Sequence, residues 1–226
     1  MTRPIPLPDY AAKALAEGRL RQVRVRLKPQ PEMGENGYLV WKVAPGVAIP
    51  LKIDWWLEEN LPLVAGERRW VQESWQYADW TEEGEPYVRY KADGVKRLLF
   101  VPIEQAMAVE DAWIALSEAR HNRGGKLAED TRWRSPVTMP EWASRWDLVV
   151  ESVRVERVQD ATEDDALAEG FTDEILGDQG RASSTTALGV LVEHWIARHG
   201  PGSWERNDWC ASAAVETVAA NIGDNR

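Results

Sequence analysis

Residues 19–28 read Arg-Leu-Arg-Gln-Val-Arg-Val-Arg-Leu-Lys, and the expected fold depends on this stretch. Its last six side chains alternate between apolar and basic, namely Val23, Arg24, Val25, Arg26, Leu27 and Lys28. A repeat of two is typical of a β-strand, whose successive side chains point to opposite faces. Pro29 and Pro31 follow, and proline ends a strand because it has no N–H to donate. We therefore expect a strand with one apolar and one basic face.

The rest of the chain indicates several short strands and few helices. Further strands are expected at residues 38–53 (two strands broken at Pro45-Gly46), 69–75, 87–91, 147–158 and 209–218. Helices are expected at residues 10–17, at 103–120, from Thr162, and from 187 to the stop at Gly200-Pro201. In the helix at 103–120 the candidate buried side chains are Met107, Trp113, Ile114 and Leu116. This pattern predicts an α+β protein, a small mixed β-barrel with short flanking helices and a helical insertion.

The short helix after Thr162 carries its own start signal. The Thr162 hydroxyl can accept from the first turn, and Asp165 follows three residues on, a variant of the capping box. We therefore expect this acidic segment to form a defined helix.

The composition excludes several classes of protein. A chain of 226 residues suits one large or two small domains and needs no disulfide or metal to hold a core. The only cysteine, Cys210, excludes an intrachain disulfide and a cysteine-rich zinc site, and we expect it to be a buried, inert thiol. His194 and His199 are five residues apart and do not share a helix face, so no metal site is expected.

Other signatures are missing from the sequence as well. It contains no Gly-rich phosphate loop, no dinucleotide fingerprint and no nucleophile elbow, so we expect no cofactor. No apolar run approaches the roughly 18 residues of a membrane helix. The N-terminus lacks the apolar core of a signal peptide. We therefore expect a cytoplasmic protein with no membrane partner.

Charge is unevenly distributed along the chain. The formal net charge is −10, which argues against non-specific wrapping of long duplex DNA. Residues 1–31 nevertheless carry seven basic and two acidic side chains, whereas residues 156–178 carry nine acidic and one basic. The two segments can simply pair with each other or be solvated. Alternatively, a basic strip for an anionic ligand faces a carboxylate that does chemistry.

Tryptophan is unusually frequent, with 13 residues against 2 phenylalanines. Tryptophan suits a protein core, and it also suits a pocket that stacks a flat base. We expect core packing for each tryptophan considered alone. Trp70 and Trp75 are expected on opposite faces, so that one can stack on a base while the other fills the core.

Several blocks of sequence, in order, resemble those of ASCH-domain proteins, a branch of the PUA-like barrels, and above all the phage- and prophage-encoded members. The blocks are residues 18–24 with 28–31, 66–75, 90–94, 135–145, 159–170, 200–204 and 207–209. They extend from about residue 3 to residue 210, with an apparent insertion around 100–132. The resemblance implies one ASCH-type domain over residues 1–226, a PUA-like barrel whose cleft binds RNA or modified bases.

The resemblance also implies where chemistry would lie. Small bacterial ASCH enzymes hydrolyse the acetyl amide of N-acetylcytidine with a Lys and a Thr from the N-terminal motif and a Glu from the short acidic helix. That Glu corresponds to Glu169, but the Lys and Thr positions are Leu20 and Val23. Neither apolar side chain can shuttle a proton or stabilise an oxyanion. Whether the chain is an enzyme is therefore left open.

The favoured function is binding of a nucleotide, a modified nucleoside or a short RNA in the barrel cleft. Seven ligand-binding residues are predicted: Arg19, Arg21, Arg24, Trp70, Glu73, Trp142 and Arg145. The arginines would contact the anion, the tryptophans would stack, and Trp142 and Arg145 would form the cleft rim. One alternative is an amidohydrolase acting on an acylated cytidine with Glu169 as general base. The other is a phage protein–protein interaction module in the host cytoplasm.

Overall fold

A computed structural model of the chain describes residues 3–33, 39–44, 47–50, 61–121, 132–172 and 186–219. The strands in these residues are β1 (Pro4–Pro6), β2 (Gln22–Arg26), β3 (Glu32–Met33), β4 (Leu39–Ala44), β5 (Val47–Pro50), β6 (Arg68–Gln72), β7 (Trp75–Trp80), β8 (Pro86–Tyr90), β9 (Lys96–Leu98), β10 (Trp146–Arg157) and β11 (Trp209–Ala219). The α-helices are α1 (Asp9–Ala16), α3 (Ala106–His121), α4 (Glu163–Ala168) and α6 (Ala187–His199), with 3₁₀ turns at Ile103–Gln105, Pro136–Thr138, Glu141–Ala143 and Val158–Asp160. The mixed α+β class is therefore confirmed.

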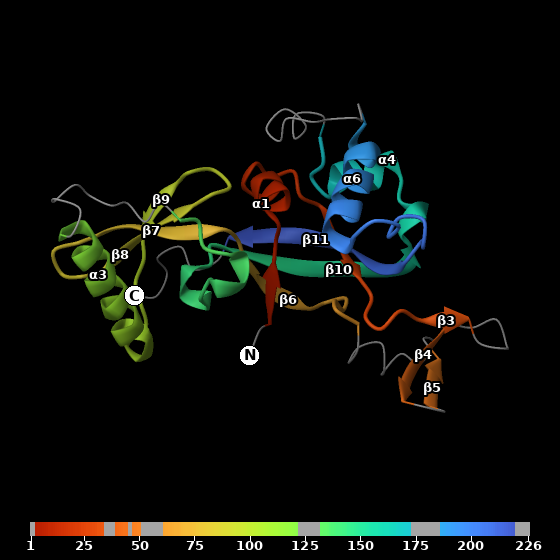
Figure 1. Cartoon of the computed structure of the whole chain (residues 1–226), viewed down its shortest axis with the longest axis horizontal. Helices are drawn as coiled ribbons and strands as arrows, with labels where there is room; N and C mark the ends of the chain where they lie inside the picture. The colour runs from red at the N-terminus through yellow and green to blue at the C-terminus, as the bar shows by residue number, and fades with distance from the viewer. Residues whose placement is uncertain are drawn as a thin grey trace. The chain divides into compact units, whose positions relative to one another are not determined.

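The strands form three sheets, labelled in Figure 1. One has five strands in the order β1-β6-β10-β11-β2, and two have three strands, β3-β4-β5 and β7-β8-β9. The basic strand predicted from residues 23–28 is β2, and it pairs antiparallel with β11 so that Val23 lies opposite Ala213. The strand expected at 209–218 is therefore present as β11 and is the partner of β2.

The chain divides into two compact units. The first unit comprises Met1–Ala16, Arg69–Leu148 and Val218–Arg226, and the second comprises Glu17–Arg68 and Val149–Thr217. Each unit is described by itself below.

The first unit is built around the β7-β8-β9 sheet and α3. Its core consists of Trp75, Tyr77, Val88, Tyr90, Leu99, Val109, Met139, Trp142 and Ala143. The rings of Trp75 and Tyr77 meet edge to face with centroids 5.1 Å apart, and the buried Tyr90 hydroxyl donates to the carbonyl oxygen of Ala143 at 2.8 Å. Aromatic side chains thus fill this core, and the phenol has its required polar partner.

The prediction of a single strand at residues 69–75 is wrong in one respect. The structure has two strands there, because β6 ends at Gln72 and β7 begins at Trp75. The two residues between these strands, Glu73 and Ser74, have polar side-chain partners elsewhere in the chain. Ser74 donates its hydroxyl to Asp9 Oδ1 at 2.6 Å, and Glu73 is held by Arg145. Trp70 and Trp75 therefore lie on different strands, and both are buried.

The helix expected at 103–120 is present, but its predicted buried face is wrong. Met107, Trp113 and Ile114 are all exposed, and the side chain of Leu116 lies outside the described residues. The helix packs against the core through Val109, with Ala112 partly buried beside it. Apolar residues occur on several sides of α3, so periodicity alone does not identify the side that packs.

The second unit places α4 and α6 side by side (Figure 1). The carboxylate of Glu163 accepts the N–H groups of Ala187 and Leu188 at 2.8 and 2.9 Å, so the start of α4 holds the start of α6. Helix α6 ends before Gly200, whose φ of +89° lies outside the range that side-chain-bearing residues favour. The predicted helix at 187–199 is confirmed. A small core of Val158, Trp195 and Cys210 lies in this unit.

The predicted start of α4 is also confirmed. The Thr162 hydroxyl accepts the N–H of Asp165 at 3.1 Å, and the Asp165 carboxylate accepts the N–H of Thr162 at 3.0 Å. The first N–H groups of a helix have no backbone acceptor within the helix. Here the side chains of Thr162 and Asp165 each accept the backbone N–H of the other residue.

Replacing the cap should destabilise the second unit measurably. Thr162→Ala removes one side of the capping box, and we expect a loss of about 1 kcal/mol of unfolding free energy. Thr162→Ser keeps the hydroxyl and should lose much less. Urea denaturation followed by far-UV circular dichroism measures both, and equal stability of the Ala and Ser variants would contradict the prediction.

Candidate functional site

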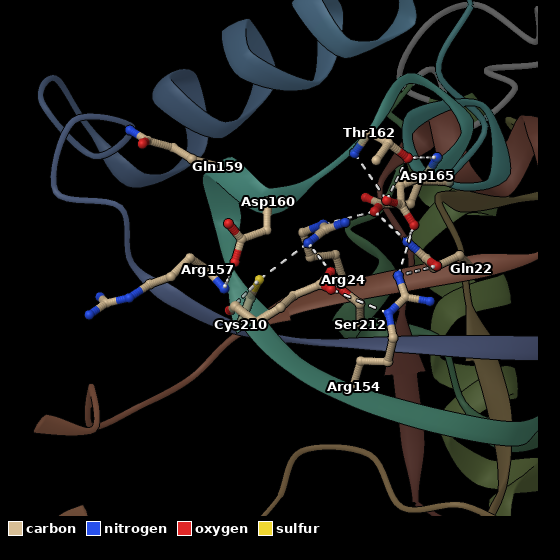
Figure 2. Close-up of polar contacts among 12 residues, drawn as sticks. Gln22, Arg24, Arg154, Arg157, Gln159, Asp160, Thr162, Asp165, Cys210 and Ser212 are labelled. Carbon is tan, nitrogen blue, oxygen red and sulfur yellow. Dashed lines mark hydrogen bonds and ion pairs between the residues drawn. The ribbon is translucent and has the colours of Figure 1, made fainter. Parts of the chain in front are cut away.

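The side chain of Arg24 is buried in the second unit, on strand β2. Its backbone lies opposite Ser212 of β11, and its side chain is only 2% exposed. Nε donates to Glu169 Oε1 at 2.8 Å, and Nη1 donates to Glu156 Oε1 at 2.8 Å. Nη1 also lies 3.3 Å from Cys210 Sγ, a contact drawn as a dashed line in Figure 2. One guanidinium thus connects β2, β10 and β11 with the end of α4.

Glu169 reaches Arg24 because of the way in which α4 ends. Glu169 is the C-terminal capping residue of the helix. Gly170 follows with a φ of +91°, a left-handed conformation typical of a residue just after a helix. The N–H of Arg21 donates to the carbonyl oxygen of Ala168 at 2.8 Å, which fixes the end of α4 to the start of β2. The Glu169 carboxyl is consequently buried, its side chain 5% exposed.

A half-exposed arginine lies on the solvent side of this group. Arg154 of β10 donates from Nη2 to Asp165 Oδ1 at 2.8 Å and to Gln22 Oε1 at 3.3 Å (Figure 2). The Gln22 amide donates in turn to Glu169 Oε1 at 3.0 Å. Ser212 donates its hydroxyl to Glu156 Oε1 at 2.6 Å. We call the set the Arg24 cluster: Gln22, Arg24, Arg154, Glu156, Asp165, Glu169, Cys210 and Ser212.

Burial and hydrogen bonding give the carboxyl groups of the cluster different pKa values. Burial raises the pKa of Glu169 above its ordinary value, although Arg24 and Gln22 oppose the rise. Burial also acts on Glu156, but hydrogen bonds from Ser212 and Arg154 outweigh it and lower that pKa. In Asp165, burial is outweighed by hydrogen bonds from Thr162 and others, and the pKa is about 2. One carboxyl thus retains a proton to higher pH while its neighbours are ionised, an arrangement frequent at functional sites.

One donor of the cluster is left without an acceptor. Arg24 Nη2 is buried and has no hydrogen-bond partner among the residues that the structure describes. An unpaired donor inside a protein costs free energy, and each such group calls for an explanation. A ligand acceptor or an ordered water can satisfy it.

Cys210 belongs to the cluster as a packing residue. Its side chain is buried, and burial raises the pKa of the thiol above its ordinary value. The sulfur lies against the Arg24 guanidinium and 3.4 Å from the carbonyl oxygen of Glu156. A thiol that stays protonated is a poor nucleophile, which agrees with the expected inert role.

Glu73 and Arg145, both predicted to bind ligand, lie together in the first unit. Arg145 donates from Nε and Nη2 to the two Glu73 carboxylate oxygens at 2.7 and 2.9 Å, and from Nη1 to Asp93 Oδ2 at 2.6 Å. The Glu73 and Arg145 side chains are each 2% exposed. The guanidinium carbon lies 4.1 Å from the centroid of the Tyr90 ring. Each of the three guanidinium nitrogens of Arg145 therefore has a hydrogen-bond partner within the protein.

The other predicted residues are distributed between the units. Trp70 and Trp142 are buried in the first unit, and Trp142 belongs to its aromatic core. In the second unit, Arg19 donates from Nε to Glu17 at 2.9 Å. The exposed Arg21 donates from Nη1 to the carbonyl oxygen of Leu20 at 2.8 Å. The structure thus brings together Arg24 and Glu169, and separately Glu73 and Arg145.

Leu20 and Val23 are both buried. The basic and acidic segments also pair, as one interpretation of the charge pattern expected. Arg24 of the basic segment forms ion pairs with Glu156 and Glu169 of the acidic segment.

Sequence reasoning missed four members of the cluster, namely Gln22, Arg154, Glu156 and Ser212. Arg154 and Glu156 are two residues apart on a strand, so they share a face, and this signal was present in the sequence. Gln22 interrupts the basic run at the start of β2. Ser212 gave no signal, because its place opposite Arg24 depends on the register between β2 and β11.

The described ranges contain no group of three or more His, Cys, Asp or Glu side chains arranged to hold a metal ion. Within the same ranges, no helix has the length and apolar character needed to cross a membrane.

Comparison of the chain with protein-family models, with curated proteins and with solved structures finds no match in any of the three.

The raised pKa of Glu169 predicts a pH dependence of stability. A carboxyl whose pKa is raised by folding stabilises the folded state most at low pH and loses that contribution as the pH rises through the raised pKa. The unfolding free energy of the wild type relative to Glu169→Gln should therefore fall above about pH 4.5. Urea denaturation at a series of pH values, followed by tryptophan fluorescence, measures this difference.

Glu156→Gln is the matched control. The pKa of Glu156 is lowered by its partners, so its contribution is present above the ordinary pKa and is lost as the pH falls through the lowered one. The wild type should gain stability relative to this variant as the pH rises. The same rising difference for Glu169→Gln would mean that Arg24 outweighs burial and that the pKa of Glu169 is in fact lowered.

Proposed function

We propose that the chain is an ASCH-type, PUA-like barrel protein that binds a nucleobase-containing ligand at the Arg24 cluster. The ligand class is a modified nucleoside, a nucleotide or a base of single-stranded RNA. The observation that carries the proposal is the buried Arg24 guanidinium, which has one unpaired nitrogen beside the buried carboxyl of Glu169.

The chemistry of the cluster suits the edge of a base. An arginine N–H donates well to ring nitrogens and carbonyl oxygens, and a carboxylate accepts from an exocyclic amine. Arg24 Nη2 and Glu169 would supply one donor and one acceptor side by side. The Gln22 amide, within 3.0 Å of the same carboxyl, adds a group that can donate and accept. Cytosine and guanine each present both an amine and a carbonyl on one edge.

The net charge supports a small or single-stranded ligand. The cluster contains three carboxyl groups against two guanidinium groups, and the chain as a whole carries −10. Long duplex nucleic acid would be repelled, because phosphate binding requires a basic surface.

Binding should depend on Arg24 and not on its exposed neighbour. We expect Arg24→Lys to weaken binding about tenfold or more, because a good side chain–base contact is worth about 1–3 kcal/mol. Arg21→Lys is the control: the sequence predicted that Arg21 binds ligand, but Arg21 is exposed, its Nη1 donates to a backbone carbonyl oxygen, and it is not part of the Arg24 cluster. Titration of purified protein with a panel of modified nucleosides and nucleotides, read by calorimetry and tryptophan fluorescence, measures both. Equal loss in the two variants, or no binding by the wild type, would contradict the proposal.

Amide hydrolysis on an acylated cytidine is the second candidate, favoured by the raised pKa of Glu169. The ionised carboxylate would take a proton from water while the water oxygen attacks the acyl carbon. Arg24 Nη2 would donate to the oxyanion of the tetrahedral intermediate. Glu169 would then return the proton to the nitrogen as the C–N bond breaks, releasing the carboxylic acid and the free amine. Arg24 stays protonated throughout, because a guanidinium does not lose its proton in proteins.

This second candidate predicts a loss of turnover in Glu169→Gln. Without a general base, the rate should fall about a hundredfold or more. Asp164→Asn is the control, because Asp164 is an exposed carboxylate on the same helix. Mass spectrometry of N-acetylcytidine incubated with each protein detects cytidine. Absence of product with the wild type would exclude hydrolysis of this substrate and leave binding as the function.

A further inference from the structure

Large apolar side chains face solvent along α3 and the 3₁₀ turn that precedes it. Ile103 is 84% exposed and Met107 is 79% exposed, while Trp113 and Ile114 are 44% exposed each. Single exposed apolar residues are ordinary, but rows of them mark interaction surfaces. Trp113 is four residues after Val109 and therefore lies on the packed side of α3. We call the remaining three, Ile103, Met107 and Ile114, the α3 apolar row.

The row lies away from the side of α3 that packs against the core. Val109 and Ala112 face the aromatic core of the first unit. With 3.6 residues per turn, Met107 and Ile114 fall on the opposite side of the helix from Val109. They are one heptad apart, and Ile103 precedes Met107 by four residues, which is the spacing of a stripe that a second helix can cover.

The charged residues that flank the row up to Glu118 are all acidic, and Arg120, near the end of α3, is the first basic residue after them. Between residues 101 and 118 the sequence contains Glu104, Glu110, Asp111 and Glu118 and neither lysine nor arginine. All four carboxylates are exposed. On the helix, Asp111 and Glu118 share the outward side with Met107 and Ile114. An apolar row interleaved with carboxylates complements a surface that joins apolar side chains to lysine or arginine.

We propose that α3 is a docking surface for a basic amphipathic helix of a partner protein. A second copy of this chain is disfavoured, because a symmetric α3–α3 contact would bring carboxylates against carboxylates. Nucleic acid and anionic lipid surfaces are disfavoured for the same reason of charge. The partner's apolar side chains would cover Met107 and Ile114, and its basic side chains would meet the flanking carboxylates. This surface shares no residue with the Arg24 cluster, since its residues belong to the first unit and those of the cluster to the second.

The test uses a synthetic peptide of about 18 residues, five turns of helix, with leucines on one side and lysines on the other. A fluorescent label reports binding to the full chain by anisotropy. We expect the lysine peptide to bind, with affinity that falls as salt rises, and a peptide with glutamate in place of lysine not to bind. The double variant Ile103→Glu with Met107→Glu should bind the lysine peptide at least tenfold more weakly.

The direction in which the double variant changes the affinity for the lysine peptide distinguishes docking on apolar side chains from attraction by charge alone. The double variant is more negative than the wild type, so attraction by charge alone would strengthen binding. Leu167→Glu adds a carboxylate at an exposed apolar residue of α4 in the second unit, and its affinity should equal or slightly exceed that of the wild type. Unchanged or tighter binding by the double variant would overturn the proposal. So would a wild-type dimer in sedimentation experiments that the double variant dissociates, because the occupant would then be a second copy.

Discussion

Burial of the Arg24 guanidinium is the constraint around which the second unit is arranged. A charge removed from water must be paired and hydrogen-bonded, and breaking a buried pair by removing one partner costs about 3–5 kcal/mol. Glu169 and Glu156 supply the opposite charge at 2.8 Å each. For Glu169 to do so, α4 must end in a fixed place, and its capping box and the Arg21–Ala168 hydrogen bond provide that. The position of the short helix and the charge of the strand therefore depend on each other.

The same arrangement gives the carboxyl groups different properties. Burial raises the pKa of Glu169, whereas at Asp165 burial is outweighed by hydrogen bonds from Thr162, Gln22 and Arg154, which lower the pKa to about 2. A protein that needed only charge balance would gain nothing from a carboxyl that resists ionisation beside an arginine. The difference is useful to a site that accepts a proton or discriminates the donors of a base edge. Binding and hydrolysis share these residues, and they differ in whether Glu169 moves a proton.

Sequence reasoning predicted the elements with strong local signals. The alternation of β2, the capping residues of α4, and the Gly200 stop after α6 each follow from local chemistry. It also offered the pairing of basic and acidic segments as one of two interpretations, and Arg24–Glu169 is such a pair. Features that depend on tertiary contacts were not predictable. Ser212 lies opposite Arg24 only through strand register, β6 and β7 separate where Glu73 and Ser74 find distant partners, and α3 buries Val109 rather than Met107.

Two arginines with buried side chains, Arg24 and Arg145, show why the ligand site is assigned to one unit and not the other. Both side chains are 2% exposed and both bind two carboxylates. In Arg145 the Nε, Nη1 and Nη2 atoms each already donate to Glu73 or Asp93, so a ligand would compete with internal partners for this guanidinium. In Arg24 the Nη2 atom has no partner in the described part of the chain, so an acceptor would add a hydrogen bond without breaking one. A hydrogen bond from Arg145 to an incoming acceptor would have to be stronger than the charge-assisted hydrogen bonds with which it competes. At Arg24 an incoming acceptor would remove the free-energy cost of the unpaired Nη2 donor. Arg24 is therefore the more favourable of the two arginines for ligand binding.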